Sequence, residues 1–439
     1  MGIVLAAGAI AGCKQGDDKP AAAPPPKAAA DRPAGPSLKE ARAAFQTKPA
    51  PTTFKPSGRT APPESAAYKL VKYPSPAGNL AAYVTADPGG GKRQPLVVFA
   101  HGGFGSIDPE DLDRGTVDSD QGPDSFREAG FAVLYPSRRG ENDNPGRFDL
   151  YYGEVDDLLA AVAYGKTLPY VDPARVYLMG HSSGGTLALL AAEMGAPVRA
   201  VFSFGGDPTI EGQVDPDDGM FNGRFTVPFD RRDPQELRLR SPEHWVRNIR
   251  VPTFYLEGEH VKVNVPGAQR MAESAARFGV PLSVHIIPGG THVDLKASKR
   301  LIAAKLLADT GPACAVALTD AELQQAYEAV WEAKASDVPP FARATPEAVA
   351  LAKSILARAK KDDHADRPQS LRVWATPDGD PRAMVDAADD IDDVACTIDG
   401  VRFVTDRATL KTLGQVSLSV VQENRRRTLK VERAAAPAK

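Results

Sequence analysis

A serine lies between two glycines in the stretch GHSSGG at residues 180–185. An apolar run at 176–179 precedes this stretch, and a helix-forming run at 186–193 follows it. A strand, a tight turn and a helix are the context in which the G-x-S-x-G pattern holds a nucleophilic serine on a strained turn. The helix would also point free N–H groups and a partial positive charge at the serine. The sequence therefore predicts acyl transfer at Ser182, with the Ser183 N–H as one oxyanion donor.

Strands and helices alternate on both sides of this serine. Helix 155–162 is the clearest of the helices, because its apolar residues recur at helical spacing on one face. Alternation of this kind after an antiparallel start predicts an α/β protein with a doubly wound, mostly parallel sheet. The predicted strands are 68–73, 80–84, 96–100, 131–135, 176–179, 200–204, 252–256 and 282–287.

Four motifs follow these strands in order: HGGF at 101–104, RG at 139–140, the serine turn, and GTH at 290–292. Together they resemble an α/β-hydrolase, in detail the catalytic domain of the prolyl oligopeptidase family and its dienelactone-hydrolase and acyl-peptidase relatives. The resemblance covers residues 68–308. It implies a serine hydrolase that works through an acyl-enzyme on a small peptide or ester, with no cofactor and no metal.

A serine hydroxyl is a weak nucleophile at neutral pH and needs a base within hydrogen-bond reach. The resemblance places this base after the last strand, where His292 stands. His181 belongs to the serine turn, and His285 lies inside a predicted strand. We therefore predict His292 as the base.

The acid that would orient the base is less well defined. The family's aspartate, counted from Gly258, falls on Val261 here. Glu257 closes an apolar strand, where a carboxylate is expensive to bury without a purpose, so it is the preferred acid. Glu259 and Asp207 are the alternatives, and a Ser–His dyad without an acid stays open.

The second oxyanion donor is expected from the turn after the third strand. By the resemblance, His101 stands where prolyl oligopeptidases have a tyrosine hydroxyl donor. Alternatively the His101 side chain braces the turn and the N–H of Gly103 or Phe104 donates, which we favour slightly. Each donor of this kind typically contributes about 3 kcal/mol to transition-state stabilisation.

Residues 3–12 form a short apolar run that ends before Cys13 in the sequence IAGC, and residues 1–12 are predicted as a signal peptide. This ending resembles the lipobox of bacterial lipoprotein signal peptides, which implies cleavage before Cys13, a lipid on its thiol, and a lipid-anchored protein of the cell envelope. The run is shorter than the about 20 apolar residues that cross a bilayer. No Lys or Arg precedes it, so an incidental Ala-rich N-terminus is the alternative.

Composition divides the remainder of the chain. Residues 13–65 are rich in Pro and Ala and predict a disordered tether. The hydrolase domain is predicted at 66–310, with an insertion or cap at about 207–250. The aromatic residues of this insertion are expected either to line a substrate pocket or to pack the insertion onto the body. The aromatic residues are Phe221, Phe225, Phe229 and Trp245.

Residues 311–439 predict a small α+β domain. Its acidic stretch 386–393 fits no metal loop and predicts a solvated surface. Cys314 and Cys396 could form a disulfide in an oxidising compartment, or remain two unrelated buried thiols. The predicted helices are 320–333 and 346–359, and the predicted strands are 371–374, 395–398, 402–404, 416–421 and 428–431.

Bulk charge suggests no nucleic-acid partner, because 53 Lys and Arg face 56 Asp and Glu for a net charge of −3. The sequence thus predicts an exported serine hydrolase, with a peptidase favoured over an esterase that would share the same chemistry. The missing family aspartate keeps a third reading open, a non-catalytic binding lipoprotein that retains the hydrolase fold.

Overall fold

The computed structural model describes residues 35–434, except 57, 64, 113–114, 215–225, 360–368, 377, 387–389, 391 and 424–425. The predicted signal peptide, Cys13, and residues 13–34 of the predicted tether lie outside the described residues. In the part of the chain that is described, no helix has the length and apolar character needed to cross a membrane.

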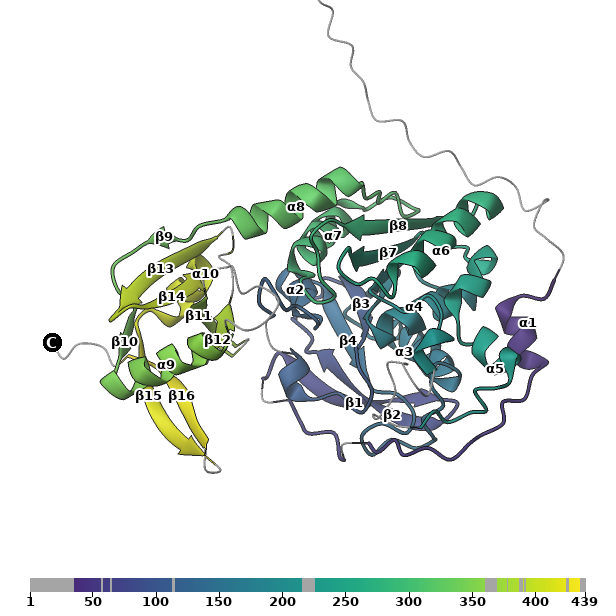
Figure 1. Ribbon diagram of the computed structural model, residues 1–439, viewed down its shortest axis with the longest axis horizontal. Helices are drawn as coiled ribbons and strands as arrows, with labels where there is room; N and C mark the ends of the chain where they lie inside the picture. Colours follow the sequence, from purple (N-terminus) through teal and green to yellow (C-terminus); the bar gives the residue numbers. More distant parts are fainter. Residues whose placement is uncertain are drawn as a thin grey trace, which may run out of the picture.

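An eight-stranded sheet forms the body of the molecule, in the order β1-β2-β4-β3-β5-β6-β7-β8 (Figure 1). β1 and β2 form an antiparallel hairpin, β2 pairs antiparallel with β4, and the remaining neighbours are parallel. The doubly wound, mostly parallel sheet predicted from the alternation is confirmed. The strands are β1 Tyr68–Ser75, β2 Gly78–Thr85, β3 Gln94–Ala100, β4 Ala132–Pro136, β5 Val171–His181, β6 Ala200–Phe204, β7 Thr253–Gly258 and β8 Leu282–Ile287.

Helices cover both faces of this sheet. Alternate residues of each strand point to opposite faces, so that Val98 joins one core and Val97 the other. The first core includes residues of α3 (Gly153–Gly165), α4 (Ser183–Glu193) and α6 (Val265–Phe278). The second includes residues of α2 (Asp124–Glu128) and α7 (Lys296–Ala308). The parallel strands are therefore buried on both sides, and their carboxyl ends converge on one edge.

The prediction of a disordered tether is wrong for the stretch that begins at Ser37. There the chain forms α1 (Leu38–Ala43), which opens with a capping box between Ser37 and Glu40. Leu38 is fully buried and its N–H donates to Asn248 Oδ1 at 3.0 Å. Figure 1 shows α1 against the hydrolase body beside α5 (Pro234–Arg238). The large apolar side chains of the stretch, Leu38, Phe45 and Phe54, pack on the core of the body, which average composition does not show.

The insertion packs onto the body. Phe229 and Trp245 are both buried. The Arg240 guanidinium lies 4.1 Å from the centre of the Phe229 ring, and Trp245 Nε1 donates to the Arg238 carbonyl at 2.8 Å. Phe229 and Trp245 also belong to the core that includes α3 and α4, so they anchor the insertion to the body, while Phe221 and Phe225 lie outside the described residues. The helical turns of the insertion are η3 Gly212–Val214, η4 Pro242–His244 and η5 Val246–Asn248. A further one, η2 Pro109–Leu112, lies between β3 and α2.

The C-terminal region has its own core between helices and two small sheets, ordered β10-β15-β16 and β12-β11-β14-β13-β9. Both predicted helices and all five predicted strands are present, with a tight turn at Asp399 and Gly400 joining β13 to β14. Three short strands and one helix were not predicted. The elements are α8 Asp320–Glu332, β9 Ser336–Asp337, β10 Ala342–Ala344, α9 Pro346–Ala359, β11 Ser370–Ala375, β12 Pro381–Asp386, β13 Asp393–Ile398, β14 Val401–Asp406, α10 Arg407–Leu413, β15 Val416–Glu423 and β16 Arg426–Arg433.

The prediction of a solvated acidic surface at 386–393 is wrong for three of its aspartates, which are buried. Arg372 pairs with Asp386 and Asp393. Asp390 pairs with two cations of α7: Lys296 Nζ at 3.0 Å, and Arg300. These pairs could not be predicted from the sequence, because the cations lie on other strands and helices than the acidic stretch.

Cys314 and Cys396 are free thiols, so the disulfide considered for them does not form. The two side chains belong to different cores. Cys396 is buried among the C-terminal sheets, whereas Cys314 packs against the body. The alternative of two unrelated thiols therefore holds.

Candidate active site

Ser182 stands where β5 ends and α4 begins, with φ 53° and ψ −121°. Its N–H donates to the Phe204 carbonyl at 2.8 Å. A Cβ at Gly180 would lie 2.2 Å from the Gly184 carbonyl oxygen, and one at Gly184 would lie 2.1 Å from that of Ala100. Only glycine fits at both positions, so the GxSxG spacing is a steric requirement of the turn. The strained backbone presents the serine at the carboxyl edge of the sheet.

Glu257 meets the ring of His292. The carboxylate lies at the end of β7 and is almost fully buried, with Oε1 3.4 Å from His292 Nδ1. Oε1 also accepts from the Gly258 N–H at 3.0 Å, and Oε2 accepts from Asn264 Nδ2 at 2.8 Å. Each carboxylate oxygen therefore has a fixed donor. Asn264 was missed in the sequence, and no spacing rule points to it.

The two alternative acids are placed differently. Glu259 is exposed, and its Oε2 accepts from the Gly289 N–H at 3.1 Å. Asp207 is buried near the site, and Gln213 Nε2 donates to it at 3.4 Å. Burial raises the pKa of Asp207 to about 7, against the opposing charge of His292. Neither carboxylate hydrogen-bonds the His292 ring, so the geometry favours Glu257.

His292 is held from its backbone as well. His181 is buried, and burial lowers its pKa to about 3, so its ring is neutral at physiological pH. Its Nε2 lies 2.9 Å from the His292 carbonyl oxygen. A neutral ring at this distance donates its Nε2–H to that carbonyl. His181 thus supports the loop that carries the base.

Gly205 packs against the His292 ring, beside the serine turn. It follows Phe204, the acceptor of the Ser182 N–H, and a Cβ here would lie 2.6 Å from His292 Cε1. Among the described residues, the Ser182 hydroxyl makes no hydrogen bond to the His292 ring. Catalytic contacts of this kind commonly tighten only when substrate binds.

The His101 ring points into the protein, which favours a backbone donor for the oxyanion. The ring is buried, with Nε2 3.0 Å from Glu141 and Nδ1 2.9 Å from the Gly102 carbonyl oxygen. Arg138 pairs with the same Glu141 carboxylate at 2.9 Å. Burial alone would raise the pKa of Glu141, but Arg138 and His101 hold it well below its usual range. His101 braces the turn, and donation by the N–H of Gly103 or Phe104 stays a prediction.

Gly103 ties this turn to the serine. Its carbonyl accepts from Ser183 Oγ at 2.6 Å and from Arg138 at 3.1 Å. Its φ of 69° suits glycine. Arg138 and Glu141 were missed in the sequence, although a charged pair directly after a buried strand, flanking the RG motif, is a signal that could have found them.

A cavity of about 800 Å³ lies between the body and the C-terminal region. Its walls come from residues 61–63 and 65, from residues 108–112 and 115–122, and from the β11–β12 hairpin, and Gly102 borders it. A Cβ at Gly102 would lie 3.4 Å from Ser182 Cβ. The cavity therefore reaches the back of the oxyanion turn, although Ser182 does not line it.

The environment of His292 predicts the pH dependence of any reaction it catalyses as a base. Burial would lower its pKa, but the hydrogen bond that its ring donates to Glu257 and the charges of Glu257 and Asp207 raise the pKa above the ordinary 6.5. The base must be neutral, so kcat/KM should rise with pH along an acid limb whose midpoint lies above 6.5. Glu257→Gln should move this midpoint down, because it removes a negative charge. Profiles of kcat/KM from about pH 5 to 9 on a non-ionising substrate would contradict this assignment if the two midpoints coincided.

The comparisons with known proteins fall on the same part of the chain. The model of the prolyl oligopeptidase family matches residues 118–309. The "Uncharacterized peptidase YtmA" of Bacillus subtilis is 25% identical over 171 residues, which are 38% of this chain and 66% of that protein. Dipeptidyl-peptidase 5 of Porphyromonas gingivalis is 27% identical over 248 residues, which are 51% of this chain and 34% of that protein.

Among solved structures, a Mycobacterium tuberculosis puromycin-hydrolyzing peptidase is 20% identical with a TM-score of 0.45, and the match covers 55% of this chain and 39% of that one. The chain spans less than two thirds of the length of each of these three proteins. The family match includes Ser182, Glu257 and His292, and it begins after the oxyanion turn. Residues 118–309, which hold most of the parallel sheet, are thus similar to the prolyl oligopeptidase family.

Proposed function

We propose that the protein is a serine hydrolase that forms an acyl-enzyme on Ser182, and that it acts as a prolyl-oligopeptidase-like serine peptidase. One observation carries the proposal. Ser182 is held on a strained turn at the carboxyl edge of the sheet, and the ring of the adjacent His181 lies 4.8 Å, centre to centre, from the ring of His292, which pairs with the buried Glu257. The peptidase assignment is supported by the family match and by the peptidase names of the relatives.

In this reaction Ser182 Oγ attacks the substrate carbonyl carbon while His292 Nε2 takes the hydroxyl proton. Glu257 holds Nδ1–H and stabilises the imidazolium. The oxyanion forms towards the Ser183 N–H at the start of α4 and the 103–104 turn. His292 then returns the proton to the leaving amine or alcohol as the bond to it breaks. Water, activated by the same ring, hydrolyses the Ser182 ester and regenerates the enzyme.

A fluorophosphonate probe tests the nucleophile, because an activated serine displaces fluoride from phosphorus and keeps the probe. We expect wild-type protein to be labelled, and Ser182→Ala protein to remain unlabelled while it melts like the wild type. An unlabelled wild-type protein would favour the reading of a non-catalytic binding lipoprotein.

A panel of aminoacyl amides and acyl esters separates peptidase from esterase, since both share the acyl-enzyme. We expect amide cleavage that is lost in Ser182→Ala. Rapid ester turnover with no amide cleavage would instead assign a carboxylesterase of the dienelactone-hydrolase type.

We also propose that the protein is exported and anchored to the cell envelope by a lipid on Cys13, on the strength of the IAGC ending alone. In a bacterial host, radioactive palmitate should label the full chain, globomycin should block its processing, and Cys13→Ala should abolish the label. An unlabelled wild-type chain of unchanged mass would refute the anchor.

A further inference from the structure

Two consecutive residues behind the oxyanion turn adopt left-handed backbone conformations. Leu150 has φ 53° and Tyr151 has φ 66°, and both side chains are buried. Bulky residues adopt such angles only where the surrounding structure holds them. The turn from Asp149 to Tyr152 therefore depends on its partners for its shape.

Three buried ionisable side chains hold this turn by its backbone. Arg42 of α1 donates to the carbonyls of Tyr151 and Tyr152, both at 2.8 Å. Arg240 of the insertion donates to the Leu150 carbonyl, also at 2.8 Å. The Glu154 carboxylate accepts from the Leu150 N–H at 3.1 Å and from the Tyr152 N–H at 3.2 Å. Two of these three side chains, Arg42 and Arg240, come from outside the sheet and its helices, and they are here called the clamps.

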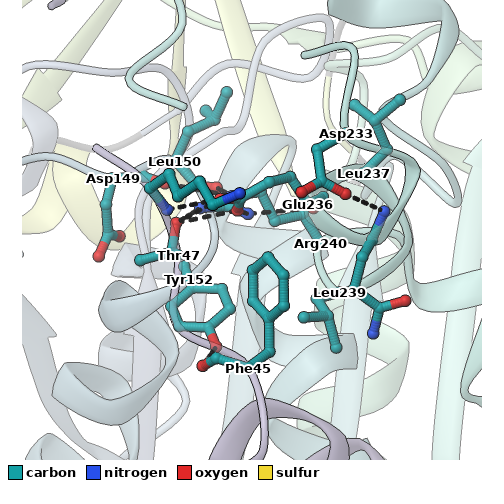
Figure 2. A network of polar contacts seen from close by, with 12 residues as sticks. Phe45, Thr47, Asp149, Leu150, Tyr152, Asp233, Glu236, Leu237, Leu239 and Arg240 are labelled. Atoms are coloured by element: carbon teal, nitrogen blue, oxygen red, sulfur yellow. Dashed lines mark hydrogen bonds and ion pairs between the residues drawn. The ribbon is translucent and has the colours of Figure 1, made fainter. Parts of the chain in front are cut away.

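The residues just after α1 bind Arg240, one of the clamps. Figure 2 shows Arg240 between Leu150, Glu236 and Thr47. Arg240 donates to Thr47 Oγ1 at 3.1 Å, and that hydroxyl donates to Glu236 at 2.9 Å. The Lys48 N–H reaches the same carboxylate at 2.8 Å. Residues 37–48, here called the strap, thus close a network around the fully buried Arg240 and Glu236.

The turn 149–152 packs behind the turn 101–104, here called the oxyanion turn. The Tyr151 ring lies 5.9 Å from the Phe104 ring, centre to centre. Phe104 follows Gly103, whose carbonyl accepts the Ser183 hydroxyl. A contiguous path of packed rings and hydrogen bonds therefore runs from Arg42 through Tyr151 to the residue beside the nucleophile.

We propose that Arg42 and Arg240 are positioning residues for the hydrolytic reaction, and that the strap is needed for catalysis because it holds Tyr151 against the oxyanion turn. The inference rests on the proposed function of the Ser182 site. It assigns a catalytic purpose to a stretch of chain outside the sheet and its helices. Loss of the clamp would let the 149–152 turn relax and would shift the donors at 103–104, where small displacements are costly.

The test compares Arg42→Ala with Lys39→Ala in the full chain. Lys39 is an exposed, positively charged residue on the same helix, so its substitution should leave kcat, KM and Tm unchanged. For Arg42→Ala, assayed well below its Tm, we expect kcat and the rate of fluorophosphonate labelling to fall roughly 10²-fold with little change in KM. A folded Arg42→Ala protein with wild-type kcat would overturn the proposal.

Arg42→Lys keeps the inference testable if the alanine variant does not fold. A lysine keeps the buried charge but lacks the planar fork that reaches several carbonyls at once, so kcat should fall by an intermediate factor. Wild-type kcat and labelling in a folded Arg42→Lys protein would overturn the proposal.

Hydrogen exchange supplies a readout that does not depend on activity. Amides of 149–154 and 101–106 should exchange faster in the Arg42 variants than in Lys39→Ala. Unchanged exchange at 149–154 would refute the clamp, whereas an unreactive wild-type protein with the expected exchange would refute only the proposed function.

Discussion

Ser182→Ala is expected to lower kcat by about 10⁶-fold, with KM close to that of the wild type. The substitution removes the only atom that can form the acyl-enzyme, while the oxyanion donors and the binding surface remain. Initial rates on an activated ester and on an aminoacyl amide, measured against a blank, would show the loss.

Ser183→Ala is the matched comparison for this result. It keeps the backbone N–H that would face the oxyanion and removes only the hydroxyl that bonds the Gly103 carbonyl at 2.6 Å. A loss of roughly tenfold is expected, consistent with one hydrogen bond of ordinary strength. Equal losses for the two variants would show that Ser182 is not the nucleophile.

Glu257→Gln is expected to lower kcat by about 10⁴-fold. An amide of the same shape can present its NH₂ group to His292 Nδ1, which would favour the wrong ring tautomer, and it no longer stabilises the imidazolium. Steady-state kinetics at a pH above the acid limb would separate this loss from a simple shift of the pH profile.

Glu259→Gln controls for the Glu257 substitution, because that carboxylate lies two residues away and is exposed. Its kcat should stay within about twofold of the wild type, because the side chain is exposed and glutamine keeps an oxygen that can accept from the Gly289 N–H. If Glu259→Gln or Asp207→Asn caused the large loss instead, the acid would have to be reassigned to that residue.

The serine turn could be predicted from sequence because its geometry is local. Gly180 and Gly184 are required by contacts within one turn and with the neighbouring strand, so the requirement appears directly in the spacing. Strand order placed His292 after the last strand. Glu257 was favoured over Glu259 by the cost of burying it, and its distance to the histidine ring agrees with that preference.

The supports of the site could not be predicted in the same way, because each joins parts of the chain that are far apart. Arg42 meets carbonyls more than a hundred positions away, within a stretch whose composition suggested disorder. Asp390 finds its cations on a helix about ninety residues earlier. Composition and periodicity describe neighbours in sequence, so they do not report such pairs.

The position of α8 has a consequence for how the chain can be divided. The Tyr327 hydroxyl of α8 lies 2.8 Å from the Gly289 carbonyl oxygen and 2.9 Å from Asp294 Oδ2, so its proton can be donated to either acceptor. Gly289 precedes His292 in the chain and Asp294 follows it. The buried Lys296, two residues further on, has its counter-charge in the C-terminal region. A shortened chain ending at residue 310 would remove the Tyr327 hydroxyl from the loop that carries His292, and the Asp390 carboxylate from Lys296. We therefore expect the body to need the C-terminal region to keep the shape of the His292 loop.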